Sequence, residues 1–294
     1  MRPTSISALL AVSPLMVACS ANLASSAETA DAETNATSAV VVVERTVGAS
    51  DARASAVARF VRMRSGAVDE DALRMVGATV DFPALGTCVT APAAKHAGAA
   101  RALELLDVGA ISLEANGLRT SLQARQLPDV VDLLSGVVYA TPTADAEALP
   151  AGSVYVLRAA GSVDLDVAPF AVSASAPDEP TQVRIAGQDI GGNGGLVALA
   201  NGSLIVDGVD VSWEAGSPDD FVYLDVAAER DAQTAARCLF SDVGRGTLIP
   251  AAFGETTSGT ITIHRLHREP FRAKGVDSGE VRFDFARVVT FSRL

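Results

Sequence analysis

Two histidines three residues apart lie in the segment "TITIHRLHREPF". Imidazoles bind metal ions and transfer protons, so His264 and His267 are the first candidates for chemistry. Ile261 and Ile263 alternate with polar residues and predict a strand that leads toward solvent, and residues three apart on a strand point to opposite faces. The pair would therefore meet on one metal ion only on a helical turn or across a bulge. His96 lies in an Ala-rich loop without a second type of metal ligand beside it, so we expect no metal site.

Aspartates are the second candidates, for acid–base chemistry. Asp164 and Asp166 in "SVDLDVAPF" share a face if this segment is a strand, and two such carboxylates can divide acid and base roles. The apolar residues between them favour the solvated side of an amphipathic strand instead. Asp219, Asp220 and Asp242 fall in predicted turns, where Asp accepts local backbone hydrogen bonds. EF-hand spacing is absent, so we assign them no calcium ion.

Cofactor and nucleophile motifs give no further candidates. The glycines between Gly187 and Gly195 lack the spacing of a dinucleotide fingerprint or a P-loop, and we interpret them as a loop. The sequence contains no G-x-S-x-G nucleophile elbow. We therefore predict no cofactor and assign no catalytic residue.

Cys19 ends an apolar run that follows the positively charged Arg2, which is the pattern of a secretory signal peptide over residues 1–18. Met16-Val17-Ala18-Cys19 resembles a bacterial lipobox, which implies cleavage before Cys19 and a diacylglycerol on its sulfur. Ser20 resembles an outer-membrane sorting signal. The alternative is ordinary cleavage nearby. No apolar window reaches the roughly 20 residues of a transmembrane helix.

Cys88 and Cys238 are the cysteines that remain if Cys19 carries lipid. An even pair in an oxidising compartment is a disulfide candidate. Such a bond would close a loop of about 150 residues and stabilise by roughly 5 kcal/mol in the chain-entropy description. Two separate buried thiols are the alternative, and the sequence leaves the choice open.

The composition limits the partners. The chain of 294 residues has a formal net charge of −12. This charge argues against binding to nucleic acid and against electrostatic binding to anionic lipid, because both partners would be repelled. Contact with a membrane is expected through the N-terminal lipid. An envelope protein or a glycan is the other expected type of partner.

Short apolar runs separated by Gly, Pro, Asn and Asp predict an all-β protein. Segments 39–47 and 55–63 are expected to be the first two strands, although the second could also be drawn as a short helix. Asn116-Gly117 favours a type I′ hairpin turn. The segments "GVVYATP" and "SVYVLRAAG" are expected to pair across the loop at 142–150.

The Pro-rich segment 176–180 predicts a domain boundary, after which Val209, Val211 and Trp213 share one strand face. Val222, Leu224 and Val226 repeat this pattern, and Phe283 and Phe285 face inward from a closing strand. We predict a signal peptide at 1–18, a lipidated cysteine and disordered tether at 19–38, an N-terminal β domain at 39–176 and an immunoglobulin-like Greek-key β-sandwich at 177–294.

The segments "LPDVVDLLSGVVYAT", "LPAGSVYVLRAAGS", "RCLFSDVGRGTLIPAAF" and "GEVRFDFARVVTF" resemble predicted lipoproteins of myxobacteria and related delta-proteobacteria. The resemblance covers roughly residues 40–294 and implies a fold and an outer-membrane address, without lending catalytic or binding residues.

Two classes of function follow. The first is a non-enzymatic, lipid-anchored envelope module that binds a partner or supports an assembly. The alternative is an exported hydrolase whose site is assembled around His264, His267 and nearby acids. We favour the first because β-sandwiches bind more often through their loops than they catalyse through their cores.

Overall fold

Strands account for nearly all regular structure in the described chain, which confirms the all-β prediction. The computed structural model describes residues 36–63, 74, 77, 79–90, 103–130, 134–142, 144–191, 195–200, 208–229 and 234–294. They belong to one compact unit, which spans residues 33–294.

The strands of the N-terminal part are β1 (Ala36–Val47), β2 (Ala52–Met63), β3 (Cys88–Thr90), β4 (Leu103–Leu105), β5 (Ile111–Ala115), β6 (Leu118–Val130), β7 (Leu134–Ala140), β8 (Ala144–Asp145), β9 (Val154–Ala159) and β10 (Phe170–Ser175), with a 3₁₀ turn η1 (Ala146–Ala148). The C-terminal part adds β11 (Arg184–Ile185), β12 (Gln188–Asp189), β13 (Leu196–Leu199), β14 (Val209–Ser212), β15 (Phe221–Ala228), β16 (Thr234–Ser241), β17 (Arg245–Leu248), η2 (Pro250–Ala252), β18 (Ser258–Ala273) and β19 (Val276–Arg293).

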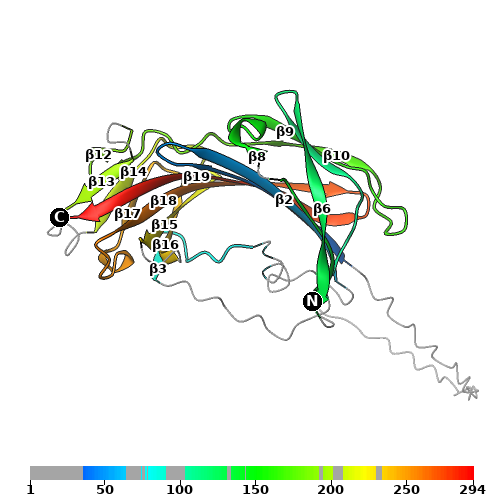
Figure 1. Ribbon diagram of the computed structural model, residues 1–294, viewed down its shortest axis with the longest axis horizontal. Helices are drawn as coiled ribbons and strands as arrows, with labels where there is room; N and C mark the ends of the chain where they lie inside the picture. The colour runs from blue at the N-terminus through cyan, green and yellow to red at the C-terminus, as the bar shows by residue number, and fades with distance from the viewer. Residues whose placement is uncertain are drawn as a thin grey trace, which may run out of the picture. The chain divides into compact units, whose positions relative to one another are not determined.

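The strands form a large sheet of 15 and a small sheet of four. The large sheet runs β10-β9-β5-β6-β7-β4-β2-β1-β19-β18-β15-β16-β3, with β13 also paired to β19 and β8 to β2. The small sheet has the order β12-β11-β14-β17. Figure 1 shows the blue hairpin of β1 and β2 beside the red β19; in the large sheet β1 lies between β2 and β19 and pairs with both.

β19 is the central strand of the large sheet. It pairs in parallel with β1, so that Val43 lies opposite Phe283, and antiparallel with β18. The β-branched and aromatic residues of both strands suit this doubly flanked position. The closing strand expected at the C-terminus is therefore an interior strand, because β1 supplies a second neighbour that a single sequence does not indicate.

Two hydrophobic cores lie on the same face of β19. Phe283 and Phe285 belong to the first core, and Val289 and Phe291 belong to the second. These four residues have odd numbers and share a face because side chains alternate along a strand. Arg287 occupies the same face between the two cores.

Different layers cover the two cores. Residues of β5, β9 and β10 pack with β1, β2 and β19 in the first core, because the large sheet curls until β10 contacts β18. The small sheet and η2 cover the second core, where Trp213, Val211 and Leu248 pack with Leu224 and Ile263. The second core is thus a two-sheet sandwich.

Several local predictions are confirmed. β1 and β2 form a hairpin, which settles the strand-or-helix alternative at 55–63 in favour of a strand. Asn116 and Gly117 join β5 to β6 with positive φ angles of 50° and 79°. Trp213 is buried in the core, as its strand pattern predicts.

Three other predictions are wrong. Residues 36–38, assigned to the tether, belong to β1 because they pair with β2. β7 and β9 do not pair with each other. β7 pairs with β6 and β2, whereas β9 pairs with β5 and β10. Residues 163–166 form a turn instead of a strand: Ser162 and Val167 exchange backbone hydrogen bonds of 2.8 and 3.0 Å, and Asp166 has a φ of 55°.

The expected boundary after residue 176 falls just beyond the end of β10, and strands from both sides of it share the large sheet. Among the residues that the structure describes, no helix is long and apolar enough to cross a membrane.

Candidate functional site: a polar belt between two cores

A band of polar side chains separates the two cores on the inner face of the large sheet. We call it the polar belt and define it as Arg45, Glu179, Asp220, Asp242, Arg265, His267 and Arg287. Along β18 the inner face passes from Ile261 and Ile263 to Arg265 and His267. The inward-facing positions of β18 are therefore apolar up to Ile263 and are occupied by Arg265 and His267 where the two cores meet.

Arg265 is the centre of the belt, and only 3% of its surface is exposed. Its Nε donates to Asp242 Oδ2 over 2.6 Å, and its Nη1 donates to the carbonyls of Asp178 and Glu179 over 3.1 and 3.3 Å. Its Nη2 donates to the Glu214 carbonyl and, over 3.3 Å, to Asp242 Oδ1. One guanidinium thus joins β18 to the segment after β10, to the segment after β14 and to the bend after β16.

Asp242 is buried beside Arg265 and also accepts a 2.6 Å hydrogen bond from the indole Nε1 of Trp213. Gly216 lies so close that a Cβ there would be 2.3 Å from Asp242 Oδ2 and 3.0 Å from Arg265 Nε. A residue with a side chain would clash with both charged groups, so this close approach requires glycine.

Glu179 extends the belt toward the first core. Its carboxylate pairs with Arg45 of β1 and lies 3.6 Å from Arg287 of β19. The Pro-rich segment after β10 is therefore fixed to two neighbouring strands of the large sheet.

His267 lies at the edge of the belt. Its Nδ1 is 2.6 Å from Oδ1 of Asp220, a carboxylate that is 2% exposed, and its Nε2 is 3.9 Å from Glu269. The hydrogen bond with Asp220 raises the pKa of His267 above 6.5, against the opposing effect of burial. A buried carboxylate that orients an imidazole is also the arrangement of many catalytic histidines.

An open groove of about 820 Å³ lies beside this edge of the belt. His267, Asp220 and Arg265 line it together with residues 175–179 and 214–217. Of the two sequence-predicted imidazoles, this groove contacts only His267.

His264 points to the outer face of the same sheet. Its ring stacks on Tyr223 with centroids 4.0 Å apart, and its Nδ1 is 2.8 Å from Asp284 Oδ1. The Tyr223 hydroxyl donates to the other oxygen of Asp284. Burial alone would raise the pKa of Asp284, but His264 and the Tyr223 hydroxyl outweigh it and lower that pKa below its ordinary value.

Arg237 covers this outer cluster. It forms a bidentate pair with Asp225 over 2.6 and 2.7 Å, and its guanidinium lies 5.0 Å from the centre of the Tyr223 ring. Phe82, in the segment before β3, packs on the same ring at 5.1 Å. Burial raises the pKa of Tyr223 well above its ordinary value, so its hydroxyl stays a donor.

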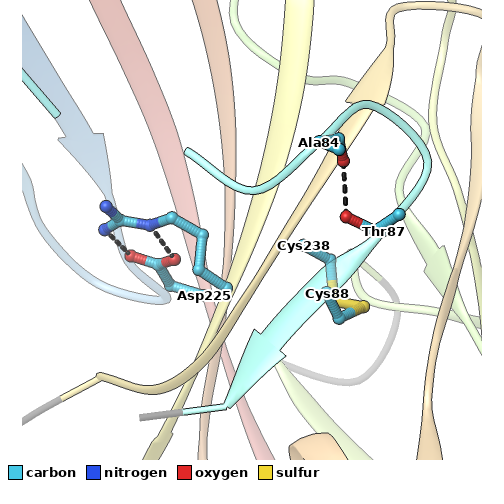
Figure 2. The surroundings of a disulfide bond; sticks show 6 residues. Ala84, Thr87, Cys88, Asp225 and Cys238 are labelled. Atoms are coloured by element: carbon cyan, nitrogen blue, oxygen red, sulfur yellow. Dashed lines mark hydrogen bonds and ion pairs between the residues drawn. A yellow bond between two sulfur atoms is a disulfide. The ribbon is translucent and has the colours of Figure 1, made fainter. Parts of the chain in front are cut away.

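The disulfide between Cys88 and Cys238 fixes that covering segment, as Figure 2 shows. The two residues face each other on β3 and β16, with Cα atoms 4.0 Å apart. Thr87 donates to the Ala84 carbonyl over 2.6 Å in the adjoining turn. The predicted pairing of these cysteines is confirmed.

The structure separates the residues that the sequence singled out. His264 and His267 lie on opposite faces of β18, so no single site contains both. Ile261 and Ile263 are in the core as expected, and beyond Leu266 the strand has only half-buried and exposed residues up to its end at Ala273. Asp164 and Asp166 are exposed in a turn. Cys19 and His96 lie outside the described residues.

Sequence reasoning missed the partners of the belt. Asp242 lies in the bend between β16 and β17, as expected for a turn residue, but its carboxylate accepts from Trp213 and Arg265 instead of from local backbone amides. A usable signal existed: Arg265 continues the inward spacing of Ile261 and Ile263, so it had to be buried and paired. Within the described residues, no group of three or more His, Cys, Asp or Glu side chains could hold a metal ion.

Comparisons with known proteins add no family. No protein-family model and no curated protein matches the chain. Among solved structures, a chain from a 1.5-MDa bacterial ice-binding adhesin, described for its retention at the host cell surface, matches with 10% identity and a TM-score of 0.20. The match covers 88% of this chain and 66% of that chain. A likeness at this TM-score carries no argument about function.

Proposed function

We propose that this protein is exported, anchored by lipid at Cys19, and serves the cell envelope as a non-enzymatic binding or structural module. The observation that carries the proposal is the disulfide between Cys88 and Cys238, which joins residues 150 positions apart. Disulfides persist in oxidising compartments and are rare in the cytosol of most organisms.

The polar belt supports a structural role for its charged residues. The two oxygens of Asp242 accept hydrogen bonds from Trp213 and Arg265, and the Arg265 guanidinium binds three backbone carbonyls besides. On the outer face, Asp284 is engaged by His264 and Tyr223. These groups hold layers together, whereas a catalytic group has to reach substrate.

The second candidate function is hydrolysis, with His267 as a general base. Its imidazole is oriented by the buried Asp220 and lines the groove of about 820 Å³. This form of the alternative uses His267 without His264, because the two rings lie on opposite faces.

Fractionation of cells tests the anchor. The full chain should sediment with outer membranes and partition into detergent, while Cys19→Ser should remain unprocessed or be released. Ser26→Ala, a change elsewhere in the predicted tether, is the matched control and should fractionate like the parent. A Cys19→Ser variant that is processed and sediments as the parent does would overturn the proposed anchor.

Chromogenic ester and amide substrates separate the two candidate functions. The proposal expects background rates from the purified full chain. Hydrolysis that exceeds background, follows the titration of His267 and disappears in His267→Gln would replace the binding module with the hydrolase.

A further inference from the structure

The second half of β18 borders β10 along a seam. Ladder pairing of β18 with β15 ends at Leu266, so the outer edge of β18 faces β10 from His267 onward. Within the described strands no ladder joins β10 to β18. The Ala168 amide donates to the Lys274 carbonyl over 3.1 Å at one end, and the Ser175 amide donates to Glu269 Oε2 over 2.7 Å at the other.

Four residues form a continuous chain of contacts at the Ser175 end. Asp220, immediately before β15, contacts His267 Nδ1, and the opposite ring nitrogen faces Glu269. Glu269 in turn accepts from the last amide of β10. The chain therefore connects the start of β15, the middle of β18 and the end of β10.

The protonation state of His267 decides whether its electrostatic interaction with the Glu269 carboxylate is attractive or repulsive. A carboxylate only accepts hydrogen bonds, so the neutral ring must place its proton on Nδ1, toward Asp220. Nε2 then presents a lone pair to the Glu269 carboxylate, 3.9 Å away. The protonated ring presents an N–H and a positive charge to the same carboxylate.

The other groups around His267 do not change which protonation state of the ring attracts Glu269. Arg265 on β18 is engaged by Asp242, and Phe283, opposite His267 on β19, is uncharged. Asp178, Glu179 and Glu214 line the same groove and add negative charge. Glu179 is paired with Arg45 and Arg287, and Glu214 accepts from Thr181 and Gln182.

We propose that His267 is a pH-dependent latch that closes the seam between β10 and β18. The protonated ring holds Glu269 against the Ser175 amide, and deprotonation releases that carboxylate and loosens the end of β10. Residues 175–179, which follow this amide, form a wall of the groove, so groove access increases as pH rises. The proposal does not depend on a lipid anchor or on either candidate function.

Amide hydrogen exchange at Ser175 tests the latch in the purified full chain. Between about pH 5 and about pH 8, the range in which histidine changes charge, its protection factor should fall by up to about fivefold, the change expected when one partly exposed ion pair is lost. Protection factors already remove the intrinsic pH dependence of exchange. The Ala168 amide, bonded to a backbone carbonyl in the same seam, is the internal control and should stay constant.

Two variants keep the test decisive. In His267→Gln the protection of Ser175 should be low and independent of pH. In Glu269→Gln, a change at a partly exposed side chain, Ser175 should also lose its pH dependence, and the pKa of His267, followed by NMR, should fall. An unchanged Ser175 protection factor across this pH range, or the same change in either variant as in the parent, would overturn the latch.

Discussion

Replacing Arg265 by Met tests whether the polar belt holds the two cores together. Met fills much of the volume of the Arg side chain but cannot donate hydrogen bonds. The substitution leaves the Asp242 carboxylate buried with the Trp213 indole and without its counter-charge. Three backbone carbonyls also lose their donor.

The expected cost follows from the burial of both partners. The side chains of Arg265 and Asp242 are 3% and 0% exposed. Removing one partner of such a pair costs about 3–5 kcal/mol, because it leaves an uncompensated buried charge. In a chain of this size each kcal/mol lowers Tm by about 2–4 °C, so the melting temperature should fall by about 10 °C.

Urea unfolding followed by Trp fluorescence measures this cost, because the single Trp of the sequence, Trp213, contacts Asp242. Arg158→Met is the matched control: Arg158 and Glu114 lie 3.6 Å apart with exposed fractions of 47% and 40%, and such a pair contributes at most about 1 kcal/mol. Equal losses in the two variants, or a loss below about 1 kcal/mol for Arg265→Met, would refute the role given to the belt.

Three further predictions follow from the same contacts. Neither Cys88 nor Cys238 should react with a thiol reagent in the unfolded, unreduced protein, and reduction should lower the free energy of unfolding by about 2–5 kcal/mol; two labelled thiols would contradict the disulfide. The pKa of His267 is raised by Asp220, so its contribution to stability is complete below the unfolded pKa of about 6.5 and is lost as pH rises through the folded pKa; chemical unfolding at several pH values should give a decline that is absent in His267→Gln. Gly216→Ala should lower Tm because its Cβ clashes with the buried ion pair, and an unchanged Tm would contradict that packing.

Strand positions were readable from the sequence where one face is apolar and the other polar. Val209 and Val211 alternate with exposed Asp210 and half-buried Ser212, and the structure has a strand there. The sequence predicts only one face of β15 correctly. Val222 and Leu224 face the second core as expected, but Tyr223 on the other face is also buried, under Phe82. The cover over its outer face comes from a segment about 140 residues earlier, and local periodicity cannot report it.

Long-range pairing was the main feature that the sequence did not indicate. The parallel pairing of β1 with β19 joins residues about 240 positions apart, and no turn signal specifies its register. The polar belt depends on that pairing, since Arg45 and Arg287 reach Glu179 from these two strands. The cysteine count alone suggested the disulfide, and the pairing of β3 with β16 places the two residues opposite each other.

Mass spectrometry of the mature N-terminus tests the central proposal most directly. In a host that processes lipoproteins, the N-terminal peptide should begin at Cys19 and carry a diacylglycerol on the sulfur, with or without a further acyl chain on the amine. Two or more acyl chains, at about 0.8 kcal/mol per buried methylene, anchor a protein stably to a membrane. An unmodified N-terminus at any other residue would contradict the lipid-anchored envelope protein and leave a chain exported without an anchor.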